Sequence, residues 1–333
     1  MASGKLRLLY VLDILKKYSD EQNPLNSADI LEHLSAFGIT AERKALYDDI
    51  YLLEQYGCDI IKTSVPKKGW FIGEREFEIP EIYLLSDAVR SAKFISPKKT
   101  RELISKLNSM LSINQKKIRE DAVFFSLSDK TENEEIYYSI DKINRAITDK
   151  KQISLSYGVR SLNEGRSISH SVKEMTVNPY ALAWQDDHYY LIGNHEKYDN
   201  LIHLRLDRIS KVKILSSKAR HFSEVSDYTD FFDTADYTKK LFGMYSGELG
   251  NIELCCNKSI IEPVLDRFSD EIFIKNVTED TFSFSTKAVI SPALVTWIMN
   301  YGDAIRAVKP ESLKNMVKTR AEKIIENYRK HGE

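Results

Sequence analysis

The spacing of apolar residues changes along the chain, and this change constrains the fold more than any other feature. Before about residue 150, apolar residues recur every three or four positions, which is the period of an amphipathic helix. From Ile153 they alternate with polar residues in short segments separated by Gly, Asn and Asp, as in successive strands. A chain of 333 residues also exceeds what one hydrophobic core usually spans. We therefore predict an α+β protein of several domains.

The first 75 residues are predicted to form a compact module of three helices and a hairpin. The first helix carries an apolar stripe that comprises Leu6, Leu9, Val11, Leu12 and Leu15. Asn26 or Ser27 can cap the second helix, and two β segments at 58–62 and 69–72 flank a loop after the third. This is the arrangement of a winged helix-turn-helix, which presents its third helix to a DNA groove.

The third helix carries the first candidate DNA contacts. Thr40 is predicted to cap it and Gly57 to end it, with an inward stripe that comprises Ala45, Leu46, Ile50 and Leu53. The stripe leaves Arg43, Lys44 and Tyr47 outward. Arg43 could read a guanine edge or clamp a phosphate, whereas Lys44 and Tyr47 suit the DNA backbone. A solvated helix face is the alternative for so short a charged run.

The loop between the β segments is the predicted wing. Lys67 and Lys68 at its tip can neutralise phosphates in a minor groove, although a pair of exposed lysines is usually only solubilising. Nearby acids keep the local charge near neutral; they are Asp48, Asp49, Glu54 and Asp59. The net charge of the whole chain is −1. One copy should therefore bind double-stranded DNA weakly, and affinity should need two copies on a symmetric site.

Three further regions are predicted after this module. Residues 76–150 should form a helical linker or dimerisation layer, and the short strands in 151–216 suggest a small β-barrel. Residues 217–333 alternate strands and helices in the order βαββαβ, followed by one more helix. That order is typical of a ferredoxin-like domain.

Several classes of function lack the residues they need. The cysteines Cys58, Cys255 and Cys256 suit neither a disulfide framework nor a tetrahedral metal site, and the histidines lack metal-ligand spacing. The sequence has no nucleophile elbow, Gly-rich phosphate loop or zinc-protease helix. No window approaches a membrane-spanning apolar run. We expect a cytoplasmic protein that is not an enzyme, has no membrane partner, and uses no cofactor and no metal.

Three ordered parts of the sequence resemble the WYL-domain regulators, a family of winged helix-turn-helix transcription factors. The run 43–50, followed by Leu53 and Gly57, resembles the family's recognition helix. The signature WYL domain is matched by 178–182, 189–193 and 204–209. Its C-terminal extension, called WCX, is matched by 231–247, 266–268, Trp297, Gly302 and Pro310. Two positions depart from the pattern, since Tyr189 replaces the tryptophan of the naming tripeptide and Asp48 stands where a basic residue is common.

The resemblance implies a fold and a mode of action. The expected parts are a Sm-like or SH3-like five-stranded barrel, a ferredoxin-like extension, a homodimer and ligand-gated DNA binding. It also implies a basic and aromatic ligand pocket, which maps here onto Ser154, Tyr157, Tyr180, Tyr190, Arg205 and Arg208. Arginines beside tyrosines suit a phosphate-bearing ligand whose base can stack, such as single-stranded DNA or a nucleotide.

Two alternatives remain open for this region. Strand alternation places His203, Arg205 and Asp207 on one face, so Asp207 could pair with an arginine for structural reasons, and Tyr180 and Tyr190 could belong to the core. The barrel could also be a dimerisation or protein-docking scaffold without a ligand.

Overall fold

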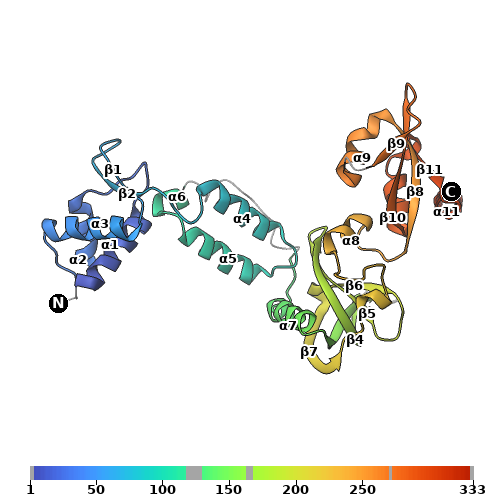
Figure 1. The fold of residues 1–333 in the computed structure, drawn as a ribbon, viewed down its shortest axis with the longest axis horizontal. Helices are drawn as coiled ribbons and strands as arrows, with labels where there is room; N and C mark the ends of the chain where they lie inside the picture. The colour runs from blue at the N-terminus through green and yellow to red at the C-terminus, as the bar shows by residue number, and fades with distance from the viewer. Residues whose placement is uncertain (1–3, 118–129, 163–167, 270–271, 331–333) are drawn as a thin grey trace. The chain divides into compact units, whose positions relative to one another are not determined.

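The computed structural model describes residues 4–117, 130–162, 168–269 and 272–330, and it divides the chain into two compact units (Figure 1). The first unit spans Met1–Glu134 and the second Glu135–Glu333. Each unit has its own buried cores, and both contain helices and antiparallel sheets. The presence of both helices and antiparallel sheets confirms the predicted α+β class.

The first unit begins with the predicted three helices and hairpin. Its elements are α1 (Gly4–Tyr18), α2 (Ser27–Ala36), α3 (Arg43–Tyr56), β1 (Ile60–Thr63) and β2 (Gly69–Ile72). Asn26 caps α2 in a capping box with Asp29, and Gly57 ends α3 with a left-handed φ of 102°. The three helices and the hairpin share one core, in which Leu46, Ile50 and Leu53 of α3 are buried.

Two details of this module differ from the prediction. Thr40 does not cap α3, because the helix begins at Arg43 with Glu42 as an N-cap that makes no side-chain cap hydrogen bond. Leu6 and Leu9 of α1 are 45% and 58% exposed, so the buried stripe consists of Val11, Ile14 and Leu15. Leu8 packs against this core, so a different face of α1 turns inward than the one predicted.

A helical layer follows in the same unit, made of α4 (Ile79–Ser91), α5 (Pro97–Ser109) and α6 (Ile113–Lys117). Arg75 joins it to the first module, because its guanidinium donates to the carbonyls of Lys16, Ser19 and Met110 at 3.0, 2.8 and 3.2 Å. The buried residues of α4 are Ile82 and Ser86. The helical prediction for 118–129 lies outside the described residues.

The second unit begins with α7 (Ile136–Thr148), which lies against a five-stranded antiparallel sheet. The strands are β3 (Lys151–Leu162), β4 (Ile168–Gln185), β5 (His188–His195), β6 (Leu201–Arg205) and β7 (Ile209–Lys218). Their order is β6-β5-β4-β3-β7, and the 3-10 turn Leu206–Arg208 carries the chain from one edge strand to the other. Among the described strands the two edges do not pair, so the five strands of the expected barrel form a sheet that is not closed.

The C-terminal part of this unit follows α8 (Thr234–Lys240) and is a four-stranded antiparallel sheet with helices. Its elements are β8 (Glu248–Asn257), α9 (Ile261–Phe268), β9 (Phe273–Lys275), β10 (Thr281–Ile290), α10 (Pro292–Met299), β11 (Ile305–Lys309) and α11 (Glu311–Lys330). The strand order is β11-β8-β10-β9, with the predicted βαββαβ sequence and a final helix. Cys256 faces the core and is 1% exposed, whereas Cys255 is half-buried on the alternate face.

Candidate functional site

A basic and aromatic surface lies on the outer side of α3 and on the β1–β2 loop. We call it the helix-wing surface, and it comprises Arg43, Lys44, Tyr47, Lys67 and Lys68, all of which are exposed. Within the part of the chain that the structure describes, neither Arg43 nor Lys44 forms an ion pair or a side-chain hydrogen bond. Both cations therefore remain available to an anionic partner. Thr40, the other predicted contact, is exposed in the segment that precedes α3.

Contacts beneath this surface fix the position of α3. Asp49 of α3 is buried and accepts two hydrogen bonds from Arg7 of α1, from Nε at 2.5 Å and from Nη2 at 3.0 Å. The hydrogen bond and the charge of Asp49 raise the pKa of Arg7 above its usual range. Asp49 therefore does not contribute to the surface charge, contrary to the sequence interpretation. Helical spacing was the available signal, because Asp49 lies three residues after Leu46 and four before Leu53 on the inward stripe.

Two side-chain contacts and a backbone bridge between Leu25 and Trp70 hold the hairpin against the helices. Tyr47 makes an edge contact with Trp70 of β2, with ring centroids 5.3 Å apart. Lys67 lies 3.3 Å from the carboxylate of Asp29 on α2. Because this ion pair is largely exposed, it contributes little to stability and Lys67 can exchange it for another anion. Lys68 has no ion pair among the residues described.

The second candidate site surrounds Arg205 at the end of β6. The guanidinium of Arg205 donates to both carboxylate oxygens of Asp207, from Nε at 3.0 Å and from Nη2 at 2.7 Å. Tyr190 lies opposite Arg205 on β5, and Tyr157 is within electrostatic range of both. We call these four residues the Arg205 cluster. Burial raises the pKa of Tyr190, so its hydroxyl stays protonated and can donate a hydrogen bond.

Among the described residues, no side-chain hydrogen bond, ion pair or ring contact joins Ser154, Tyr180 or Arg208 to this cluster. Tyr180 is 9% exposed and packs against Phe222 and Phe232, and burial raises its pKa to about 12. Its environment matches the alternative in which this tyrosine belongs to the core. Ser154 lies on β3 and Arg208 in the turn that follows β6; both are half-buried.

Sequence reasoning missed the partner of His203. This imidazole lies on β6, its Nε2 is 2.9 Å from the Tyr237 hydroxyl of α8, and its Nδ1 is 3.4 Å from the Ser246 hydroxyl. Burial lowers the pKa of His203 to about 4. The contact joins the five-stranded sheet to the segment that leads into the C-terminal sheet. No local pattern could reveal it, because Tyr237 lies 34 positions later in the sequence.

The buried His203 predicts a pH dependence of stability. The unfolded imidazole has a pKa near 6.5 and the folded one about 4, so only the unfolded state binds a proton between these values. The contribution of His203 is fully present above pH 6.5 and is lost as the pH falls toward 4. We expect the second unit to lose about 2 kcal/mol between pH 7 and pH 5 from this group. Urea unfolding of wild type and His203→Gln at both pH values measures it, and an equal loss in both proteins would contradict the assignment.

Comparison with known proteins identifies the middle of the chain. The WYL domain family matches residues 139–214, which run from α7 to β7. The chain therefore carries a WYL domain, as the resemblance indicated, and α7 is part of it. Proteasome accessory factor B/C (PafBC) of Arthrobacter aurescens is a similar solved structure, with 16% identity and a TM-score of 0.27 over 95% of this chain and 48% of that chain. The chain thus spans about half of the length of PafBC.

The comparison with curated proteins gave no match. Among the described residues, no group of three or more His, Cys, Asp or Glu side chains is placed to hold a metal ion. Within the same residues, no helix combines the length and the apolar character that crossing a membrane requires.

Proposed function

We propose that this protein is a ligand-responsive transcription regulator that binds a palindromic DNA operator as a homodimer. In this proposal the helix-wing surface contacts double-stranded DNA, and the WYL domain senses a single-stranded nucleic acid or a nucleotide. The protein acts by binding and not by catalysis, and it works in the cytoplasm, where its operator lies. The observation that carries the proposal is the pair of cations without ion pairs at the start of α3, beside the lysines of the wing.

One observation favours the alternative in which the WYL domain has no ligand. The bidentate pair of Arg205 with Asp207 occupies the guanidinium edge that a phosphate would use. An effector must therefore displace Asp207 or bind through the remaining donors of Arg205. If it does neither, the WYL domain serves as a dimerisation or protein-docking scaffold, and the protein regulates DNA without a ligand.

Replacing Arg43 tests the DNA-binding part of this proposal. We expect Arg43→Ala to weaken specific operator binding by about 1–3 kcal/mol, because a bidentate contact to a base is lost. Binding to an unrelated duplex should weaken far less. Fluorescence anisotropy at one fixed salt concentration measures both affinities. Arg101→Ala, which removes an exposed arginine of α5, is the matched control and should change neither. Equal loss on both duplexes would make Arg43 a backbone contact only.

A further inference from the structure

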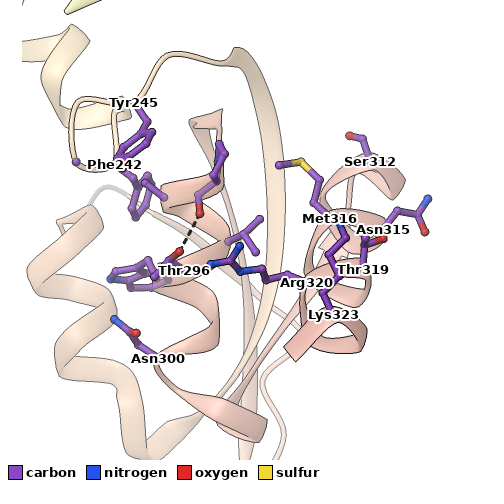
Figure 2. A pocket seen from close by; sticks show the side chains of 15 residues that line it. Phe242, Tyr245, Thr296, Asn300, Ser312, Asn315, Met316, Thr319, Arg320 and Lys323 are labelled. Carbon is purple, nitrogen blue, oxygen red and sulfur yellow. Dashed lines mark hydrogen bonds between the residues drawn. The ribbon is translucent and has the colours of Figure 1, made fainter. Parts of the chain in front are cut away.

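A cavity lies in the C-terminal part of the second unit, and no residue of the Arg205 cluster lines it. It is an open groove between α10 and α11, closed at one end by the turn that contains Phe242 and Tyr245 (Figure 2). Its volume is about 770 Å³. Small-molecule sites in proteins usually measure roughly 300–1,000 Å³, so the groove has room for one small ligand.

The charged side chains that line the groove, among the residues described, are both cations. Arg320 and Lys323 lie one turn apart on α11, and Figure 2 shows the Arg320 side chain extending from α11 toward Thr296 on α10. Neither cation forms an ion pair with a described residue. No Asp or Glu is among the described side chains that line the groove. Other lysines of α11 are neutralised within the helix, since Lys314 pairs with Glu311 and Lys318 with Glu322. The charge that the described residues present to the groove is therefore positive.

The opposite wall supplies flat apolar surfaces. Phe242 and Tyr245 lie across the groove from Met316 of α11, and Trp297 also lines the groove. Phe242 and Trp297 are held by their own contacts, with ring centroids 5.7 Å apart and with the Arg267 guanidinium over the Phe242 ring. Gly243 turns the chain between Phe242 and Tyr245 with a φ of 56°, a conformation that favours glycine. A planar ring can therefore lie against a wall that is already ordered.

We propose that this groove binds a small planar aromatic anion, with the ring against Trp297 and Tyr245 and the negative charge beside Arg320 and Lys323. Nucleoside monophosphates and aromatic carboxylates share this chemistry. The site is separate from the Arg205 cluster, so the inference goes beyond the function proposed above and does not depend on it.

Titration of the full chain with adenosine 5′-monophosphate, indole-3-acetate and uncharged adenosine tests the proposal. Binding is followed by calorimetry and by tryptophan fluorescence, to which Trp297 contributes. We expect at least one of the two anions to bind at least tenfold more tightly than adenosine. The double variant Arg320→Gln with Lys323→Gln should weaken that anion at least tenfold. Trp297→Phe should remove the fluorescence change while calorimetry still detects binding.

Two control proteins distinguish binding in this groove from binding elsewhere on the chain. The double variant Lys314→Gln with Lys318→Gln removes the same charge from α11 outside the groove and should bind the anion as wild type does. Binding that Arg205→Ala removes and the groove variants leave intact would belong to the Arg205 cluster, and that outcome also overturns the proposal. The proposal is overturned if neither anion binds, if adenosine binds equally well, or if the control double variant loses as much affinity. It is also overturned if the groove variants only dissociate a dimer, because a second copy of the chain would then be the occupant.

Discussion

Replacing Arg7 with alanine is expected to destabilise the first unit by about 3 kcal/mol or more. The reason is the carboxylate of Asp49, whose side chain is 5% exposed and whose two hydrogen bonds from Arg7 would both be lost. A buried charge without its partner costs far more than the pair contributes when it is complete. Hydrogen exchange of the amides in α1 and α3, followed by mass spectrometry, measures the opening free energy.

Two variants control for other causes of this loss. Asp48→Ala removes the exposed neighbouring acid and should change stability by less than about 0.5 kcal/mol. Arg7→Met combined with Asp49→Leu removes both charges and should recover most of the stability, because apolar side chains can replace a buried pair. A loss below about 1 kcal/mol in Arg7→Ala would mean that the pair does not position α3.

The second large effect concerns the effector. We expect Arg205→Ala to weaken the binding of a fluorescein-labelled oligothymidylate by about 2 kcal/mol, or roughly thirtyfold, because a half-buried guanidinium is a strong phosphate donor. Regulation of operator binding by that oligonucleotide should be lost, while operator binding without it survives. Fluorescence anisotropy of the labelled strand gives the first result, and competition on a labelled duplex gives the second.

A second variant, Asp207→Asn, tests whether the effector displaces Asp207 from Arg205. It removes the charge that occupies Arg205 and keeps a similar shape, so it should tighten oligonucleotide binding if the effector displaces Asp207. If wild type does not bind the oligonucleotide, or if neither variant changes its affinity, the Arg205 cluster is structural and the WYL domain is a scaffold.

Local patterns predicted the elements of this protein well where one face of a helix or strand is buried. The N-cap at Asn26, the end of α3 at Gly57 and the succession of strands and helices in the C-terminal part all follow from short segments of sequence. The pairing of Asp207 with an arginine was one of two open alternatives, although Asp207 lies in the 3-10 turn after β6 and not on the strand. Such features depend on residues two to four positions apart, which the sequence displays directly.

Features that depend on distant segments were not predictable in this way. The open sheet depends on how far β6 and β7 curl toward each other, and the alternation of residues is the same in a barrel and in a sheet. The position of Tyr180 was ambiguous because Phe222 and Phe232, which enclose it, lie beyond the sheet in the sequence. The α10–α11 groove combines the turn at Gly243 with two later helices, so no single motif marks it.

The central claim is that α3 and the wing contact a duplex, and selection from a random double-stranded DNA library tests it most directly. We predict that the wild-type protein enriches an inverted repeat whose half-sites lie about 10 base pairs apart or at a multiple of that distance. Arg43→Ala should enrich no such repeat, whereas Arg101→Ala should enrich the wild-type sequence. Enrichment of the same repeat by Arg43→Ala, or the absence of any enriched sequence with wild type at low salt, would contradict the account.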